Sequence, residues 1–434
     1  MAFDFSIEPD FQADLDWIDD FVRTEVEPID VLFPNVNHTY DKKNEVVQGL
    51  VRPLQQVVRE RGLWATHLPP SLGGMGIGNV KLGLINEILG RSTFAPSVFG
   101  CQAPDSGNAE VLAHFGTDAQ KAEYLQPLLD GTISSTYAMT EPQGGADPGN
   151  FTCSAVLDGG EWVVNGQKWF ASNYTMASFV IAMVITDTTV PVHRGSSMLL
   201  IPMGTPGMNL IRAVGLGDEA IGHGSHGYLQ FDDCRVPAEN LLGDVGAGFQ
   251  IAQTRLGGGR LHHAMRTVGL CRAALDMMGE RIVSRRTKGA PLSDQQSVRH
   301  AFADSWIQLE QFRLQVLHAA WQCDQNGYDK SRHYIAGIKV ATPKTMMDIA
   351  YRALHLHGSL GASNEMPFNR MMASGISLGL ADGPTEVHKD NLARKVLKGY
   401  RPAEGLFPTA HLPTRIAAAR EKFAGRLEHD LSNS

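Results

Sequence analysis

Apolar residues in the first third of the chain recur at the three- and four-residue spacing of amphipathic helices. The stretch LPPSLGGMGIG at residues 68–78 interrupts this pattern with proline and glycine and predicts a loop. Thr117, with Gln120 three residues later, fits a capping box that begins a further helix. Residues 1–135 therefore predict an all-helical domain. The helical runs cover 10–26, 46–61, 80–89 and 117–129.

The pattern changes after Ser134 to short stretches of alternating apolar and β-branched residues. Two turn signals lie among them, a DGG at 158–160 and an NG at 165–166. No helix-length pattern separates these stretches, so residues 136–245 predict a compact antiparallel β domain. The further strand-like stretches are 179–186, 197–202, 210–214 and 228–231.

Long helical patterns with short connections return after the β region and predict a helical bundle over residues 246–400. Three consecutive glycines at 257–259 would each weaken a helix by up to about 1 kcal/mol, so we expect a loop there or a backbone pressed close to another group. A C-terminal extension, 401–434, has three prolines and then an amphipathic piece at 414–427, which we expect to pack on a neighbour. The fold class predicted by this order is α+β with several domains.

Composition narrows the class of protein without indicating a chemistry. The 434 residues allow two or three domains, and 43% hydrophobic with 19% charged residues is typical of a globular protein. A net charge of −8 gives no electrostatic reason to expect nucleic acid. No apolar run approaches the roughly 20 residues that span a bilayer, and the first residues lack the features of a signal peptide. Five scattered cysteines suggest reduced thiols, so we expect a cytoplasmic protein without a disulfide framework or a zinc site.

One carboxylate stands out at the end of the bundle region. Asp382 precedes Gly383 and Pro384, directly before a short helical run. A carboxylate in this place could act as a general base in a mostly apolar environment. It could instead cap the following helix, and from this stretch alone the cap is the better interpretation.

Seven motifs between residues 137 and 388 carry a further signal. They are YAMTEPQGGAD (137–147), NGQKWFASN (165–173), FDDCRVPAENLLG (231–243), GFQIAQTRLGGGR (248–260), RRTKGAPLSDQQ (285–296), HGSLGASNEMP (357–367) and ADGPTEVH (381–388). Taken together, they resemble the acyl-CoA dehydrogenase family in order and spacing. The resemblance implies an N-terminal helical domain, a middle β-barrel-like domain, a C-terminal four-helix bundle and FAD as the cofactor. The final motif is most similar to a branch of the family in which aspartate replaces the usual glutamate base.

The resemblance implies which residues surround the flavin ring. Met139 and Thr140 would contact it through backbone and hydroxyl, although Thr140 could also be a plain strand residue. Phe170 and Ser172 would flank the isoalloxazine. Phe170 stands where many relatives have tryptophan, so it keeps a ring face but loses an N–H donor, and on its own it could be a core residue. Ala146 replaces a small hydroxyl residue near the flavin phosphate or acyl-CoA and can offer only a backbone contact.

A second set of residues would also bind the cofactor, and the resemblance places Arg285 and Gln296 of this set against the FAD of a neighbouring subunit. Arg285 matches an arginine that reaches the FAD pyrophosphate, although it could also be a solvated helix end. Gln296 matches a glutamine beside the adenosine, His355 stands where many relatives have glutamine, and Ser359 replaces a glycine. His355 and His357 face apart on a helix, so we expect no metal site there.

The register of the last motif assigns Asp382 as the catalytic base. Glu386, one helical turn later, is a rival, but the family uses that position to contact the flavin. An alternative base position of some relatives falls on Gly259, which cannot serve. Arg260 aligns with an arginine near the base, or is simply an arginine at the edge of the core. Gly383 would lie beside the substrate and Pro384 beside the flavin.

The implied reaction is α,β-dehydrogenation of an acyl-CoA to a trans-2-enoyl-CoA, with electrons passed to an electron-transfer flavoprotein. The implied assembly is a homodimer or homotetramer. Other possibilities of the same fold are a nitroalkane-oxidase-like enzyme, a monooxygenase-like flavoenzyme and a non-catalytic acyl-CoA- or FAD-binding subunit. The sequence does not fix the length, branching or substitution of the acyl group.

Overall fold

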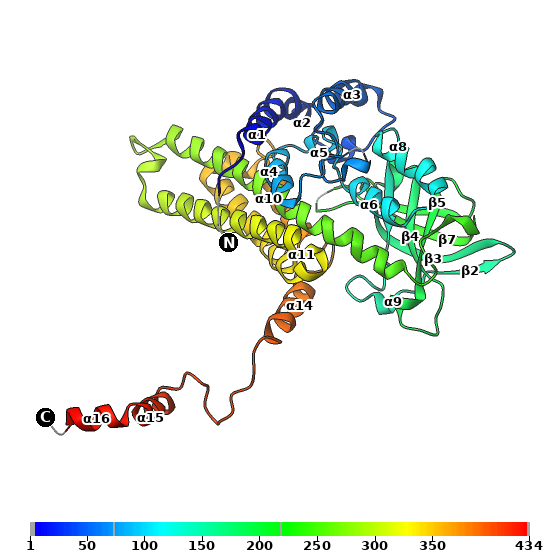
Figure 1. Cartoon of the computed structure of the whole chain (residues 1–434). Helices are drawn as coiled ribbons and strands as arrows, with labels where there is room; N and C mark the ends of the chain where they lie inside the picture. The colour runs from blue at the N-terminus through cyan, green and yellow to red at the C-terminus, as the bar shows by residue number, and fades with distance from the viewer. Residues whose placement is uncertain (1–4, 73, 218, 432–434) are drawn as a thin grey trace. The chain divides into compact units, whose positions relative to one another are not determined.

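The computed structural model describes residues 5–72, 74–217 and 219–431. The chain divides into two compact units, Met1–Lys389 and Asp390–Ser434. The larger unit holds the helices of the N-terminal third, a β-sheet and most of a helical bundle, and these are drawn in Figure 1.

Helices account for the regular structure of the described residues that precede residue 135, as the apolar spacing predicts. The first helix buries Phe11, Leu15 and Ile18 on one face. Thr117 and Gln120 form the predicted capping box, with both reciprocal hydrogen bonds present. The elements are α1 (Pro9–Phe21), a π-helical turn (Val22–Val26), α2 (Glu27–Leu32), α3 (Glu45–Glu60), α4 (Asn79–Leu89), α5 (Ala95–Val98), α6 (Asp105–Phe115), α7 (Asp118–Gln120) and α8 (Gln126–Leu129).

An eight-stranded sheet follows, with the strand order β6-β7-β3-β2-β4-β5-β8 and with β1 paired to β4. Most neighbours are antiparallel, as predicted, but β1 and β2 both pair with β4 in parallel. β4 is buried along its whole length. The strands are β1 (Ser135–Ala138), β2 (Ser154–Asp158), β3 (Glu161–Ser172), β4 (Phe179–Ile185), β5 (Ser196–Pro202), β6 (Met208–Val214), β7 (His226–Pro237) and β8 (Leu241–Leu242), with a short helix α9 (Val192–Gly195) before β5.

Only one of the two predicted hairpin turns is a turn. Gly159 and Gly160 connect β2 to β3, with Asp158 paired to Glu161. The prediction of a turn at Asn165 and Gly166 is wrong, because both residues lie inside β3 at a bulge where Gly166 has a φ of 130°. At this bulge the Asn165 side chain donates to Asp233 Oδ1 and accepts the backbone N–H of Asp233 in β7. The neighbouring strand thus stabilises the irregular backbone that Asn165 and Gly166 allow.

Two long helices dominate the bundle and run side by side in Figure 1. The glycines at 257–259 lie within the first of them, so a loop is not formed there. The second contains a non-helical residue, Gly327, that separates its two halves. The two halves fold back on each other, as the hydrogen bond from Arg352 in the second half to Gln308 Oε1 in the first, at 2.8 Å, shows. The elements are α10 (Gly248–Ser284), β9 (Arg286–Thr287), β10 (Ala290–Pro291), α11 (Gln296–His357), α12 (Ser359–Ala362), α13 (Phe368–Leu378) and α14 (Thr385–Leu397).

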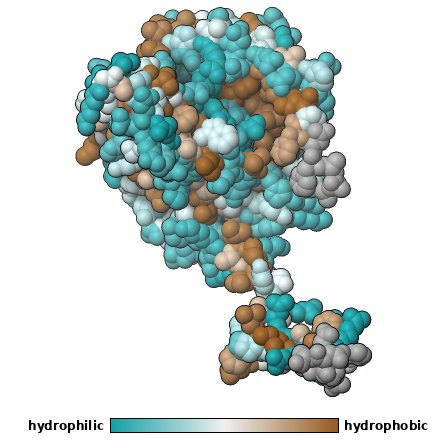
Figure 2. Space-filling model, turned by 90° about the vertical axis from the view of Figure 1, so that its left-hand side faces the viewer, coloured by the Kyte–Doolittle hydropathy of each residue, from teal (hydrophilic) through white to brown (hydrophobic). Residues whose placement is uncertain are grey.

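The smaller unit contains the end of α14 and two further helices, α15 (Leu412–Lys422) and α16 (Ala424–Leu431). Large apolar side chains are exposed in it, including Leu406, Leu412 and Ile416. Figure 2 shows apolar atoms among polar ones on the surface of this unit. Across the described residues, no helix combines the length and apolar character that a membrane crossing requires.

Candidate active site

Asp382 lies in the turn between α13 and α14 with an unusual backbone conformation. Its φ is 56°, in the left-handed region that residues other than glycine seldom adopt. Helix α14 begins at Thr385, so Asp382 precedes the N-cap position by two residues. The next residue, Gly383, has a φ of 102°, and a Cβ there would stand 2.9 Å from His388 Nε2. The turn therefore requires glycine after the carboxylate.

Two side chains hold the Asp382 backbone through its carbonyl oxygen. Arg260 Nε of α10 donates to this oxygen at 2.9 Å, and His388 Nε2 of α14 donates to it at 3.1 Å. Four residues before Asp382, the carbonyl of Leu378 at the end of α13 accepts a hydrogen bond from the buried Nζ of Lys339 in α11. Left-handed backbone costs of order 1–3 kcal/mol and persists only where its surroundings fix it. Three elements supply that restraint here.

The carboxylate of Asp382 faces positively charged and imidazole groups. Its side chain is 18% exposed, and its Oδ2 lies 3.7 Å from His263 Nε2. Burial lowers the pKa of Lys339 to about 8, while the negative charge of Asp382 acts in the opposite direction. Burial also lowers the pKa of His263, again against Asp382. His263 was not singled out by the motifs, although its place one turn after Arg260 on the same helix face was a usable signal.

The triple glycine of α10 is a point of close approach for three other elements. A Cβ on Gly258 would stand 3.2 Å from Glu110 Oε2 of α6, and one on Gly259 would stand 3.5 Å from Asp382 Oδ2. A Cβ on the first of the three would stand 3.6 Å from Tyr328 of α11. Only the distance at Gly258 is tighter than ordinary van der Waals contact, so the predicted close approach is found at that glycine and not at the other two. Burial raises the pKa of the Glu110 carboxyl to about 7, with Arg255 acting against it.

Arg255 and Tyr137 connect this helix with the β-sheet. The Arg255 guanidinium lies 4.0 Å from the centre of the Tyr137 ring, within cation–π range. Its Nε donates to Asn108 Oδ1 of α6 at 2.8 Å. Burial raises the pKa of Tyr137, Arg255 lowers it and the charge of Asp382 raises it again. Strand β1, helix α10 and the Asp382 turn thus converge, and β1 leads directly into the predicted flavin-contacting segment.

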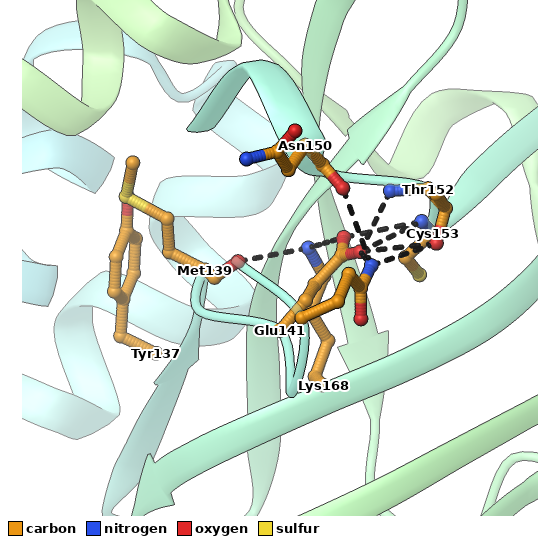
Figure 3. A network of polar contacts seen from close by, with 8 residues as sticks. Tyr137, Met139, Glu141, Asn150, Thr152, Cys153 and Lys168 are labelled. Atoms are coloured by element: carbon orange, nitrogen blue, oxygen red, sulfur yellow. Dashed lines mark hydrogen bonds and ion pairs between the residues drawn. The ribbon is translucent and has the colours of Figure 1, made fainter. Parts of the chain in front are cut away.

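A fully buried ion pair supports that segment, as Figure 3 shows. Lys168 Nζ lies 2.8 Å from Glu141 Oε1 and also donates to the carbonyl of Met139 at 2.9 Å. Glu141 Oε2 accepts the backbone N–H of Thr152 at 2.7 Å, and the backbone N–H of Cys153 also donates to this carboxylate. The charges are therefore paired and hydrogen-bonded on several sides, as buried charges must be. The network fixes the path of residues 139–141.

The residues beside this segment fit the flavin that the resemblance implies. Phe170 has a φ of 57° and its side chain is 37% exposed, so it presents a ring instead of filling the core. Ser172 Oγ lies 2.9 Å from His226 Nδ1. The carbonyl of Thr140 accepts the backbone N–H of Trp169 at 2.8 Å, which ties the segment to β3. An aromatic face and two hydroxyls on rigid backbone suit a planar ring with polar edges. Ala146 is exposed and can offer its backbone.

The second predicted set of cofactor residues lies elsewhere on the larger unit. Arg285 follows Gly259 by 26 residues along α10, a separation of about 39 Å on a helix. Arg281, one turn earlier, donates to the carbonyl of His357 at 3.4 Å, so the ends of α10 and α11 lie together. One chain therefore does not bring this set to Asp382. Four exposed residues make up the set: Arg285, Gln296, His355 and Ser359. Glu386, in the first turn of α14, is also exposed.

Three family models match the chain in order. They are described as the N-terminal, middle and C-terminal domains of acyl-CoA dehydrogenase and match residues 9–132, 136–234 and 246–397. "Acyl-CoA dehydrogenase family member 11" of Rattus norvegicus is 42% identical over 356 residues, which is 80% of this chain and 45% of that protein. The chain thus spans about half the length of such relatives. A Mycobacterium tuberculosis protein described as a probable acyl-CoA dehydrogenase, FadE2, is 36% identical and covers 88% of this chain and 93% of its own.

Solved structures of this kind share the fold. Butyryl-CoA dehydrogenase from Megasphaera elsdenii superposes with a TM-score of 0.75 at 27% identity and covers 91% of this chain and all of its own. Glutaryl-coenzyme A dehydrogenase in complex with glutaryl-CoA gives a TM-score of 0.76 at 25% identity, covering 94% of this chain and 100% of that one. The predicted fold class and the resemblance are therefore confirmed. The chain belongs to the acyl-CoA dehydrogenase family, whose enzymes are FAD-dependent oxidoreductases.

Proposed function

We propose that this protein is an FAD-dependent acyl-CoA dehydrogenase in which Asp382 removes the α-proton of an acyl-CoA thioester. The observation that carries the proposal is the restrained turn. A carboxylate in left-handed backbone is held by Arg260 and His388 and faces the glycine-lined stretch of α10. Strain that is fixed by several elements is typical of functional positions. A carboxylate that served only to cap α14 would need none of these restraints.

The residues of the chain divide the work of the reaction as follows. Asp382 accepts the α-proton, and its backbone N–H is proposed to donate to the thioester carbonyl, which makes that proton more acidic. FAD, when bound, supplies the acceptor for the β-hydride. Lys339 and Arg260 place positive charge near the carboxylate, and the negative charge of Asp382 raises the pKa of both cations against the lowering effect of burial. The product is a trans-2-enoyl-CoA.

The left-handed backbone suggests how an aspartate replaces a longer glutamate. Aspartate is shorter by about 1.5 Å, and a misplacement of this order can slow a reaction roughly 100-fold. We propose that the φ of 56° redirects the Asp382 side chain and that the two donors to its carbonyl preserve this direction. Gly383 contributes to the same backbone geometry, because a side chain there would collide with His388.

Cofactor contacts are proposed from two subunits. Met139, Thr140, Phe170 and Ser172 would hold the flavin ring of their own subunit, with Ala146 and Pro384 beside it. Arg285, Gln296, His355 and Ser359 would bind the FAD of a neighbour. The separation of about 39 Å along α10 supports this division, because one chain cannot place both sets on one ring system. The protein would then be at least a homodimer. Glu386 remains a proposed contact of the flavin edge.

The natural electron acceptor is proposed to be an electron-transfer flavoprotein, by analogy with the family. A nitroalkane-oxidase-like or monooxygenase-like enzyme would consume oxygen in turnover, whereas a dehydrogenase would reduce its carrier. A non-catalytic binding subunit would do neither.

Product analysis tests the proposal. The purified FAD-bound protein is incubated with acyl-CoA thioesters of graded length and an artificial electron acceptor, and the thioesters are resolved by mass spectrometry. We expect loss of two mass units from at least one thioester without stoichiometric hydrogen peroxide. Peroxide formed from nitroalkanes, or no change in any thioester, would contradict the proposal.

A further inference from the structure

His263 of α10 approaches the Asp382 carboxylate with a side chain that can accept a proton. Its Nε2 lies 3.7 Å from Asp382 Oδ2. It projects from α10 one turn after Arg260, which donates to the Asp382 carbonyl at 2.9 Å. Residues three apart on a helix share a face. Two residues on one face of α10 therefore contact Asp382: Arg260 holds its backbone carbonyl, and His263 lies beside its carboxylate.

A base that has removed a substrate proton must lose it before the next turnover. The side chain of Asp382 is only 18% exposed, so its carboxyl has little direct access to water. The side chain of His263 is 34% exposed. A proton transferred from the carboxyl to this imidazole would reach a group with about twice the exposed fraction.

The surroundings of His263 keep its imidazole neutral and therefore able to accept a proton. Lys339 of α11 and Arg255 and Arg266 of its own helix are the positive groups that act on it. Together with burial they disfavour the imidazolium, and Asp382 is the opposing negative charge. Transfer from a carboxyl leaves an ion pair between carboxylate and imidazolium, which that negative charge stabilises.

We propose that His263 takes the proton from Asp382 after α-proton abstraction and returns the base to its ionised form. The Oδ–H bond of the protonated Asp382 breaks, an Nε2–H bond forms on His263, and the imidazolium then releases its proton to solvent. No oxidant or co-reactant enters this step. The inference rests on the proposed function of Asp382, and its tests separate the two.

Titration of His263 tests the coupling without substrate or turnover. The imidazole ¹⁵N signals of the FAD-bound protein are followed with pH, and the His263 signal is assigned by its loss in His263→Gln. Asp382→Asn removes the carboxylate that favours the imidazolium, so we expect the His263 midpoint to fall by about 1 pH unit. The same midpoint in both proteins would overturn the proposal, whether or not any thioester is a substrate.

Kinetics of His263→Ala test the proton transfer itself. Single-turnover bleaching of FAD should remain within about twofold of the unmodified protein, because Asp382 still removes the first proton. Steady-state turnover should fall about 100-fold, in the range of general acid–base effects, and added imidazole should restore it in proportion to its free-base fraction. Unchanged steady-state turnover, absence of rescue, or loss of single-turnover bleaching with FAD still bound would each overturn the proposal.

His262 provides a matched control on the same helix. Its ring lies 6.0 Å from that of His67, between ring centres, and thus faces a different neighbour. His262→Asn should leave turnover within about twofold and should not respond to imidazole. If His262→Asn shows the same rescue as His263→Ala, imidazole acts at no particular site, and the assignment to His263 is wrong.

Discussion

At the scale of single residues, the site depends on backbone geometry as much as on side-chain chemistry. Asp382 and Gly383 both have positive φ, and the imidazole of His388 occupies the space that a side chain on Gly383 would need. The same imidazole donates to the Asp382 carbonyl. A change at Gly383 should therefore disturb the base without touching its carboxylate.

Gly383→Ala should lower both stability and activity. Its Cβ would stand 2.9 Å from His388 Nε2 and would occupy a φ of 102°, so we expect a loss of about 1–3 kcal/mol of unfolding free energy and at least tenfold in turnover. Urea unfolding and steady-state kinetics measure the two effects. Gly160→Ala is the matched control, with a φ of 86° and nothing within 4 Å of the added Cβ. Equal activity losses in the two variants would contradict the role of the Gly383 contact.

At this scale, the candidate base could be predicted from the sequence, but the contacts around it could not. Asp382 lies in the ADGPTEVH motif, so its position could be matched to that of the family's catalytic carboxylate. His263 and Glu110 carry no motif signal, since they meet the site only through folding of α10 and α6. The glycines at 257–259 were a visible clue that something approaches, but a sequence does not name the neighbour.

At the scale of elements, the segment after β1 is fixed by the buried pair of Glu141 and Lys168, which is stabilised by backbone amides. Lys168→Met would leave the Glu141 carboxylate buried without its partner, and we expect a loss of about 3–5 kcal/mol of stability and weaker FAD binding. Thermal unfolding and FAD content measure these effects. The double variant Glu141→Gln with Lys168→Met removes both charges and should recover part of the stability. No recovery, or an unchanged FAD content in the single variant, would contradict this role.

The contact between the N-terminal helices and α10 should make stability depend on pH. Both ring nitrogens of His67 are buried, and burial lowers the pKa of His67 to about 4. Between pH 6.5 and 4 the unfolded state binds a proton that the folded state does not. Stability therefore falls as pH falls through this window, by about 2 kcal/mol at pH 5. His67→Phe should lose less stability than the unmodified protein between pH 7 and 5 in urea unfolding. Equal losses would contradict the assignment.

The prediction of secondary structure was correct where a local sequence signal was not overridden by long-range strand pairing. The periodic face of α1 and the capping box at Thr117 are local features, and both formed as predicted. Asn165 and Gly166 carried an equally strong local turn signal, but pairing with β7 converted it into a bulge. Strand pairing depends on residues more than 60 positions away, which local patterns do not contain.

At the scale of the whole molecule, Arg285 lies about 39 Å along α10 from the glycine that faces Asp382, and the proposed shared cofactor site therefore requires more than one subunit. Arg285→Gln should weaken FAD binding about tenfold, because a charge-assisted phosphate contact would be lost. Flavin release measured by fluorescence tests this. Arg286→Gln is the control, since Arg286 donates to the nearby Gly289 carbonyl at 2.6 Å. Equal effects of both substitutions, or a monomeric FAD-bound protein in sizing experiments, would contradict the shared site.

The most direct test of the central claim is anaerobic bleaching of bound FAD by a panel of acyl-CoA thioesters, compared between the unmodified protein and Asp382→Asn. At least one thioester should bleach the flavin of the unmodified protein. The variant should retain FAD but show no bleaching, because the amide cannot accept the α-proton. Bleaching that persists in Asp382→Asn would move the base to another residue such as Glu386, and an unmodified protein that no thioester bleaches would contradict the account as a whole.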